Sequence, residues 1–237
     1  MKKGCIYYTS SDLHLALLIP CQKQLRKVFN GEIVNISLES MNFGINYVME
    51  NRTKSYPTMI RQILLALEKS SADIVFFTEH DVLYHPSHFD FTPEKKEIYY
   101  YNVNNYRWRW TTDIAITYGA LHSLSGMCCY RETAIKHYKY RINVMEEQKL
   151  DENRDREPRW ARKFGYEPGT KLRRRGGITN ETFETWKSAY PNVDIRHRHT
   201  FSHPKTFKRE FKHLPPDFTE INIKDIPGWN LKELFNL

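Results

Sequence analysis

The stretch Asp73-Ile-Val-Phe-Phe-Thr-Glu-His-Asp81 decides the fold, because a short apolar run in it ends abruptly in two carboxylates. The unbroken run is typical of a buried strand, and Glu79 and Asp81 follow where that strand emerges. In open α/β sheets, ligands bind outside the carboxyl ends of the strands. Two acids at this position therefore predict a site for a divalent cation and for the anionic group that the cation neutralises.

Strands and helices alternate before this stretch. Residues 4–8 and 32–39 are expected to form strands, and residues 13–29 a helix that Pro20 kinks or divides. Residues 42–56 are polar, and we expect a loop with some helix there.

The helix expected at residues 57–70 has the clearest pattern. Pro57 suits a first helical turn, and Ser55 just before it is a possible cap. One apolar stripe runs along this helix: Ile60, Ile63, Leu64 and Leu67. With the strand at residues 73–77, the first eighty residues have the order β-α-β-α-β, which predicts a parallel sheet with crossover helices.

The rest of the chain continues this pattern less regularly. Further elements are expected as strands at 98–103 and 114–121, a turn at Ser125 and Gly126, a helix at 131–140 and a strand at 194–201. After Lys149 the composition becomes densely charged, but no repeat or long linker separates the two parts. We therefore expect one domain over residues 1–237 with an elaborated C-terminal third.

Composition narrows the classes of partner. Of the 237 residues, 40% are hydrophobic, which supports a substantial core. The formal net charge of +8 favours an anionic partner such as a nucleotide, a nucleic acid or an acidic membrane surface. The alternative is a soluble enzyme that is merely basic.

The cysteines and the apolar segments indicate the compartment. Cys5, Cys21, Cys128 and Cys129 form no CxxC metal pattern, and a chain of this size needs no disulfide framework. The apolar residues 6–8 are too few for a signal peptide, and no run approaches the ~20 residues of a membrane span. We expect a soluble cytoplasmic protein without a transmembrane segment.

Three histidines late in the chain are candidate metal or phosphate ligands. His197 and His199 are two residues apart and fall on one face of the expected strand, with His203 just beyond. The alternative is a strand that packs half-buried histidines between Arg196 and Arg198. A zinc site built from these histidines alone is disfavoured because no matching cysteine pair is present.

A basic loop is a candidate phosphate site. It comprises Lys171, Arg173, Arg174, Arg175, Gly176 and Gly177. Arginine forks match phosphate oxygens, and glycines let a backbone close over a ligand. The alternative is a solvated run of charge.

An acidic cluster could supply a general base toward a hydroxyl group. It consists of Asp151, Glu152, Asp155 and Glu157. The alternative is a charged helix start, where acids are favoured.

An aromatic and basic segment runs from Tyr99 to Trp110 and includes Arg107 and Arg109. Its rings could stack on sugars or bases, and its arginines would add charge. The alternative is an edge strand with aromatic packing.

Taken in order, these features resemble the GT-A-fold glycosyltransferases of the family-2-like kind. The resemblance rests on the β-α-β-α start, the acid-x-acid motif Glu79-His80-Asp81, the turn Leu124-Ser-Gly-Met-Cys-Cys-Tyr-Arg131, the segment Asp155-Arg-Glu157 and the histidine-bearing strand. It covers roughly residues 4 to 203 as a pattern rather than an identity. It implies an α/β, GT-A-like (Rossmann-type) fold with a mostly parallel sheet flanked by helices. Residues 1–121 would be a nucleotide-binding half and residues 122–237 an acceptor half.

The resemblance also assigns roles to residues. Asp81 would bind Mn²⁺ or Mg²⁺ with a late histidine, His199 or His197, and Glu79 would lie nearer the ribose or sugar. Glu79 departs from the family, which usually has Asp as the first acid. Tyr8, Thr9 and Glu39 would frame the nucleotide base. Ser125 and Gly126 would abut donor sugar and acceptor, and Asp155 or Glu157 would be the catalytic base. Apart from the resemblance, the chemistry of the basic loop makes Arg174 and Arg175 the arginines expected to contact the donor.

The expected function is metal-dependent transfer of a sugar from a nucleotide-sugar, with a UDP-sugar as the expected donor, to an acceptor hydroxyl. The expected acceptor is a modified base in DNA; a lipid-linked or polysaccharide precursor is the alternative. Two other classes stay open, a metal-dependent nuclease or phosphotransferase and a non-catalytic nucleic-acid-binding module. The donor sugar, the stereochemistry and the oligomeric state are open at this point.

Overall fold

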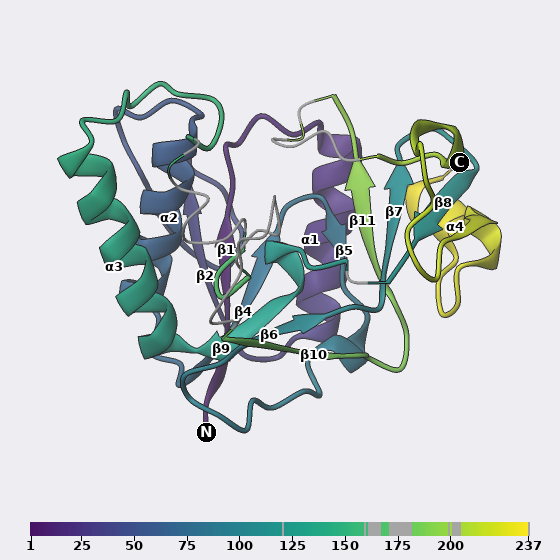
Figure 1. Cartoon of the computed structure of the whole chain (residues 1–237), viewed down its shortest axis with the longest axis horizontal. Coiled ribbons are helices and arrows are strands. Elements are labelled where there is room, and N and C mark those ends of the chain that lie inside the picture. Colours follow the sequence, from purple (N-terminus) through teal and green to yellow (C-terminus); the bar gives the residue numbers. More distant parts are fainter. Residues whose placement is uncertain are drawn as a thin grey trace.

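Two β-sheets organise the chain (Figure 1). The computed structural model describes residues 1–119, 121–158, 160, 167–170, 182–198, 200 and 205–236. Within these residues a seven-stranded sheet has the order β10-β6-β9-β4-β1-β2-β3, and a five-stranded sheet has the order β12-β8-β7-β11-β5.

The first part of the chain builds four parallel neighbours of the larger sheet. They are β1 (Lys3–Tyr8), β2 (Glu32–Ser37), β3 (Ile45–Val48) and β4 (Ile74–Glu79). The register pairs Tyr8 at the end of β1 with Glu79 at the end of β4. The expected β-α-β-α-β order is present with one added strand, β3, between β2 and α2. The carboxyl ends of these strands meet at one edge, where the site lies.

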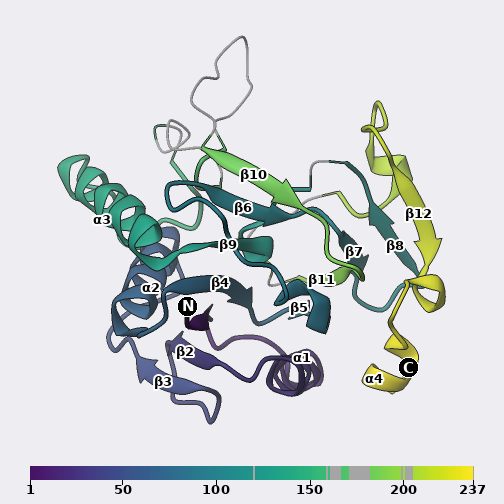
Figure 2. The ribbon, with the colours of Figure 1, turned by 90° about the horizontal axis from the view of Figure 1, so that it is seen from below.

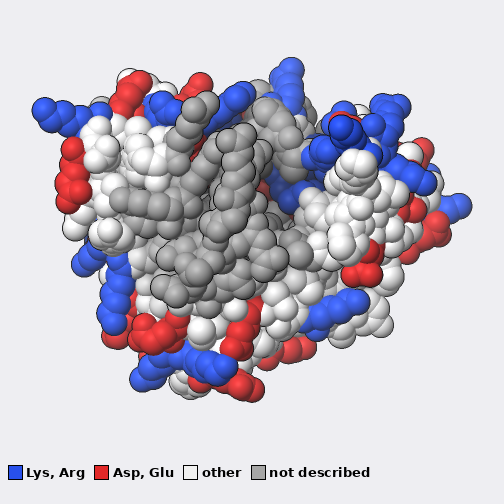
Figure 3. Space-filling view, viewed as in Figure 1, with Lys and Arg blue, Asp and Glu red and all other residues white. Residues whose placement is uncertain are grey.

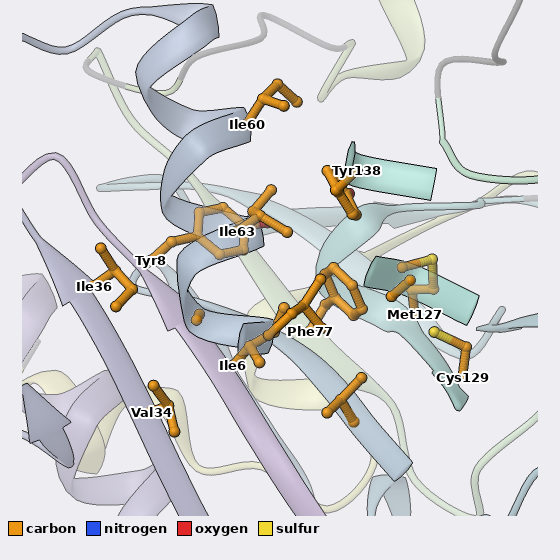
Figure 4. Packing of buried hydrophobic residues seen from close by; sticks show 14 of the residues in the cluster. Ile6, Tyr8, Val34, Ile36, Ile60, Ile63, Phe77, Met127, Cys129 and Tyr138 are labelled. Atoms are coloured by element: carbon orange, nitrogen blue, oxygen red, sulfur yellow. The ribbon is translucent and has the colours of Figure 1, made fainter. Parts of the chain in front are cut away.

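Helices cover both faces of this sheet (Figure 2). They are α1 (Leu15–Val28) on one face, and α2 (Tyr56–Lys69) with α3 (Arg131–Glu147) on the other. Successive strand residues point to opposite faces, so Ile6 packs in the core under α2 while Cys5 packs in the core under α1. Figure 4 shows Ile60 and Ile63 of α2 in the first of these cores.

The predicted features of α2 are present. The Ser55 hydroxyl accepts a hydrogen bond from the backbone N–H of Thr58 (3.2 Å), and Pro57 lies in the first turn. Ile60 and Ile63 are buried. The cap and the apolar stripe thus fix where the helix begins and which face it buries.

The other half of the large sheet is mixed rather than purely parallel. It consists of β6 (Tyr99–Asn102), β9 (Met127–Tyr130) and β10 (Phe183–Trp186). β9 runs antiparallel to both β4 and β6, whereas β6 and β10 are parallel. Cys128 and Cys129 lie in β9, are buried on opposite faces and form no disulfide.

The smaller sheet lies beside the carboxyl end of β4. Its strands are β5 (Val82–Leu83), β7 (Asn105–Arg109), β8 (Ile114–Thr117), β11 (Asn192–Arg196) and β12 (Thr219–Asn222). Its core packs Trp108 and Val193 against α4 (Leu231–Phe235). The 3₁₀ turns are η1 (Pro86–His88), η2 (Leu124–Gly126), η4 (Lys208–Glu210) and η5 (Ile223–Asp225).

Several expected boundaries need correction. The helix expected within residues 42–56 is wrong, because β3 forms there as an edge strand paired with β2. Pro20 lies inside α1 without ending it. Proline has no backbone N–H, so the helical hydrogen bond from residue 20 to the carbonyl of Ala16 is missing. Ala16 is exposed, and water can bond its carbonyl instead. The edge-strand alternative for the aromatic segment is also wrong for β7, which lies between β8 and β11 and buries Trp108 completely.

Element lengths differ from expectation in four further places. The strands expected to reach residues 39 and 121 end at Ser37 and Thr117. The helix expected at residues 131–140 continues to Glu147, and the strand expected at 194–201 starts at Asn192 and ends at Arg196. Strand ends depend on partner strands, which local patterns do not reveal.

Both sheets draw strands from each side of residue 121. The expected nucleotide-binding and acceptor halves therefore do not correspond to separate sheets, and their roles stay a prediction. No helix in the described part of the chain has the length and apolar character needed to cross a membrane.

His88 joins the two sheets from η1. Its Nδ1 accepts hydrogen bonds from the amides of Asn102 in β6 (3.0 Å) and Asn192 in β11 (3.1 Å). Its ring stacks on Trp186, with centroids 5.5 Å apart. Burial lowers the pKa of His88 to about 3, so the imidazole is neutral.

Replacing His88 with Asn, which keeps an acceptor near the position of Nδ1, should flatten the acid side of the stability curve. In the unfolded chain this histidine binds a proton near pH 6.5, whereas in the folded protein it stays neutral. The contribution of His88 to the free energy of unfolding is therefore complete above about pH 6.5 and is lost as pH falls. With the folded pKa at about 3, the loss by about pH 5 is roughly 2 kcal/mol. Urea unfolding at about pH 5 and about pH 8 measures the difference.

The matched control is His213→Asn, because His213 is exposed. We expect this variant to keep the pH dependence of the natural sequence. If His88→Asn kept it too, the neutral, buried His88 would not be a source of acid sensitivity.

Candidate metal centre and substrate cavity

The chain passes from the large sheet to the small one over two residues, His80 and Asp81. β4 ends at Glu79 and β5 begins at Val82. The carbonyl oxygen of Asp81 accepts a hydrogen bond from the N–H of Ile195 in β11 (2.9 Å). This bond extends the β5–β11 ladder and brings the end of β11 against the end of β4.

Three side chains at this junction could hold a metal ion. The ligand atoms of His80, Asp81 and His197 all lie within 4.8 Å of one another. Asp81 Oδ2 is 3.2 Å from His197 Nε2. Nδ1 of His80 is 2.5 Å from the hydroxyl oxygen of Thr9, which orients this ring from the end of β1.

The donor set fits a divalent transition ion. Burial lowers the pKa of His80, which favours the neutral imidazole that a metal requires. Burial would raise the pKa of Asp81, but the hydrogen bond with His197 and the charges of its basic neighbours outweigh it, so the pKa is lowered and the carboxylate stays ionised. Two imidazoles and one carboxylate suit Mn²⁺ better than Mg²⁺, which prefers oxygen ligands.

Glu79 lies beside this group but faces the core under α2. Its Oε1 accepts a hydrogen bond from the Tyr8 hydroxyl (2.5 Å). Burial and the nearby charge of Asp81 raise the pKa of Glu79 to about 7. The strand ends at Glu79, and His80 and Asp81 form a turn, so the two acids do not share a face as they would on a longer strand.

A buried ion cluster supports the junction from β7 and β11. Asp194 forms an ion pair with Arg196, and Arg107 Nε lies 3.9 Å from the same carboxylate oxygen. Burial alone would lower the pKa of Arg196. The negative charges of Asp194, Asp81 and Glu79 outweigh this effect and raise the pKa, so the guanidinium stays charged. Both arginines line the adjoining cavity and give it positive charge.

His80 and Asp81 of the metal-ligand group line a cavity of about 340 Å³, which we call the donor cavity. The ends of β1 and β2, the start of α2 and the turn η2 contribute the other walls. Gln62 of α2 donates hydrogen bonds to the carbonyls of Thr9 (2.8 Å) and Ile36 (3.2 Å), which holds these strand ends together. The volume falls in the range of small-molecule sites.

The structure brings several of the expected residues together here. Tyr8, Thr9, Glu79 and Asp81 line the donor cavity, and His197 joins Asp81 in the metal-ligand group. Ser125 lines it as well. Glu39 is exposed and does not line the cavity; its neighbour Leu38 does.

Other expected residues lie outside the described part of the chain. These are His199, His203 and the basic loop with Arg174 and Arg175. Their roles stay predictions.

The two candidate bases differ in position. Asp155 is exposed and does not line the donor cavity, whereas Glu157 does. Glu157 Oε1 lies 3.2 Å from the guanidinium of Arg141, which also donates a hydrogen bond to the Tyr56 hydroxyl (3.0 Å). This buried arginine stabilises the ionised form of Glu157.

Sequence reasoning missed two carboxyl or imidazole groups at the site. His80 is the middle residue of the acid-x-acid motif, a position that the motif leaves unspecified. It joins Asp81 in the metal-ligand group because β4 ends at Glu79, one residue before it. Glu167 lines the donor cavity, and burial together with the charge of Glu79 raises its pKa to about 8. No local motif marks Glu167, because its neighbours in the cavity come from distant parts of the chain.

No protein-family model matches the chain, and no curated protein matches it. Among solved structures, similarity extends to the bifunctional IspDF from Campylobacter jejuni (10% identity, TM-score 0.37, 58% of this chain and 43% of that one). It also extends to a mycobacterial protein (11% identity, TM-score 0.37, 64% of this chain and 64% of that one). A third structure is the apo-form glycosyltransferase GlyE from Streptococcus pneumoniae TIGR4 (10% identity, TM-score 0.36, 65% of this chain and 41% of that one). The chain spans less than two thirds of each of these structures, and scores this low assign neither family nor activity.

Mn²⁺ should bind the protein more tightly than Mg²⁺, and His80→Gln should weaken Mn²⁺ binding by at least about tenfold, because an imidazole ligand is lost. Asp81→Asn should have the same effect, since it removes the anionic ligand. Isothermal titration calorimetry with each ion measures both.

The matched control is His85→Gln, because His85 lies two residues beyond β5 and outside the metal-ligand group. We expect unchanged Mn²⁺ affinity for this variant. Equal loss in His85→Gln and His80→Gln would contradict a metal site at the β4–β5 junction.

Proposed function

We propose that this protein is a metal-dependent glycosyltransferase that moves a sugar from a nucleotide-sugar, a UDP-sugar being the favoured donor, to an acceptor hydroxyl. One observation carries the proposal: a His-Asp-His group lies where β4 ends, and two of its members, His80 and Asp81, line the donor cavity. This is where open α/β sheets bind their ligands. A diphosphate is the kind of ligand that needs both a metal and a neighbouring cavity.

The walls of the donor cavity suit a nucleoside diphosphate. Tyr8, Leu38 and Tyr56 offer apolar and aromatic surface for a base. Arg107 and Arg196 offer charge near the metal-ligand group for phosphate oxygens.

His80, Asp81 and His197 would hold the divalent ion, which supplies positive charge to a diphosphate leaving group. Arg107 and Arg196 add fixed positive charge on the same side of the donor cavity. Because their charges are held by Asp194 before any ligand binds, no reorganisation is needed as the leaving group gains charge.

Glu167 is the base that we favour for a direct displacement. The acceptor oxygen bonds to the anomeric carbon while the bond from that carbon to the diphosphate oxygen breaks, and the hydroxyl proton passes to the carboxylate. Glu167 lines the donor cavity, and a pKa of about 8 makes its carboxylate a strong proton acceptor. Glu157 is the second candidate, weakened as a base by its ion pair with Arg141.

A nucleoside diphosphate should raise the melting temperature only when Mn²⁺ is present, and UDP should do so more than ADP or GDP. Ligand at 100-fold excess over its dissociation constant adds about 2.7 kcal/mol of stability, enough for a shift of several degrees. Asp81→Asn should abolish the joint effect.

The competing outcome is cleavage of DNA by the protein with Mn²⁺ and no nucleotide-sugar. That result, together with no thermal shift by any nucleoside diphosphate, would make the protein a nuclease and overturn the glycosyltransferase proposal.

Glu167→Gln should lower the rate of transfer by about 10² to 10⁴-fold, because the acceptor hydroxyl loses its proton acceptor. In the natural sequence the rate should rise with pH up to about 8, as Glu167 ionises, and this rise should be absent in the variant. Hydrolysis-corrected transfer from the donor, measured against pH, provides the readout.

Asp155→Asn is the matched control, since Asp155 is an exposed acid nearby in sequence and should leave the rate unchanged. A loss confined to Glu157→Gln would assign the base to Glu157 instead of Glu167.

A further inference from the structure

A second cavity, which we call the basic pocket, lies across the metal-ligand group from the donor cavity. Its volume is about 700 Å³. It shares Arg196 and Thr200 with the donor cavity, and His197 lines it while Asp81 lines the donor cavity. The His197–Asp81 contact therefore belongs to the wall between the two cavities.

The lining of the basic pocket is strongly cationic. Arg109, Arg196, Arg198 and Lys205 line it against a single carboxylate among the described residues, that of Glu210. In Figure 3, Lys and Arg side chains gather at the upper right, over the ends of β7 and β11.

The one carboxylate of the lining is already engaged. Glu210 Oε2 accepts hydrogen bonds from the backbone N–H groups of Thr206 (2.6 Å) and Phe207 (2.9 Å), and Oε1 accepts one from Arg109 (3.1 Å). These bonds lower the pKa of Glu210 against the opposing effect of burial. Glu210 therefore braces the loop and pairs with Arg109, and Arg198 and Lys205 are the other exposed cations of the described lining.

The basic pocket also has an aromatic wall. Trp110 lines it and makes edge contacts with Trp108 and Phe235, with ring centroids 5.2 and 5.0 Å away. Because packing against the small-sheet core fixes this indole, it needs no ordering when a ring stacks on it. A fixed indole beside several cations is the combination that binds single-stranded nucleic acid.

We propose that the basic pocket binds a single nucleic-acid strand, with phosphates on Arg198 and Lys205 and a base against Trp110. This strand would be the acceptor of the proposed glycosyltransferase. Its role as acceptor rests on the proposed function, whereas its binding in the basic pocket does not. A strand bound here lies across the metal-ligand group from the donor. A concave pocket of this volume admits a nucleotide, whereas a flat bilayer surface cannot enter it.

The test is fluorescence anisotropy with a labelled single-stranded oligodeoxynucleotide across a salt series. The double variant Arg198→Gln/Lys205→Gln removes two exposed cations of the pocket. It should bind at least about tenfold more weakly at low salt. The slope of log affinity against log salt should fall by about 1.4, since each phosphate contact on a single strand contributes about 0.7.

The matched control is Lys136→Gln/Lys139→Gln, which removes two exposed cations from α3 at the other end of the molecule (Figure 1). It should keep the affinity and the slope of the natural sequence. Equal weakening in both double variants would overturn the proposal, because binding would then follow net charge alone. So would pocket-dependent binding of an acidic polysaccharide or of anionic lipid vesicles with no binding of the oligonucleotide.

The two proposals fail separately. Normal Mn²⁺-dependent stabilisation by UDP, with oligonucleotide binding that ignores Arg198 and Lys205, would overturn the basic pocket alone. Pocket-dependent oligonucleotide binding without any response to a nucleoside diphosphate and Mn²⁺ would support the nucleic-acid site and overturn the glycosyltransferase.

Discussion

The hydrogen bond from Ile195 N–H to the Asp81 carbonyl, 2.9 Å long, is the constraint on which the site depends. It pairs the chain just after β4 with β11 and so joins the two sheets at one turn. Because of it, a histidine from residue 197 reaches a carboxylate from residue 81. The same turn separates the donor cavity from the basic pocket, so one local geometry sets the metal-ligand group and both cavities.

The electrostatics of the junction follow from crowding buried charge into one place. Burial raises the pKa of Glu79 and of Asp194, and each is raised further by the nearby charge of Asp81. Arg196 partly offsets this repulsion through its ion pair with Asp194. A divalent cation beside Asp81 would relieve the repulsion further, which is a physical reason for the protein to bind one here.

The elements with strong local patterns could be predicted from the sequence. The cap at Ser55 and the apolar stripe of α2 defined a helix, and the apolar run before Glu79 defined β4. β9 could not be predicted, because four residues inserted antiparallel between β4 and β6 carry no pattern of their own. The metal-ligand group could not be predicted for the same reason, because it depends on pairing between distant segments. The β5–β11 ladder brings His197 to Asp81, and the end of β4 places His80 beside them.

Pulsed electron paramagnetic resonance of the Mn²⁺-loaded protein tests the central claim most directly, because it detects nitrogen nuclei bound to the ion. We expect couplings from two imidazole nitrogens, with one lost in His80→Gln and one lost in His197→Gln. A spectrum without nitrogen couplings, or one that both substitutions leave unchanged, would contradict a metal centre at the junction of the two sheets.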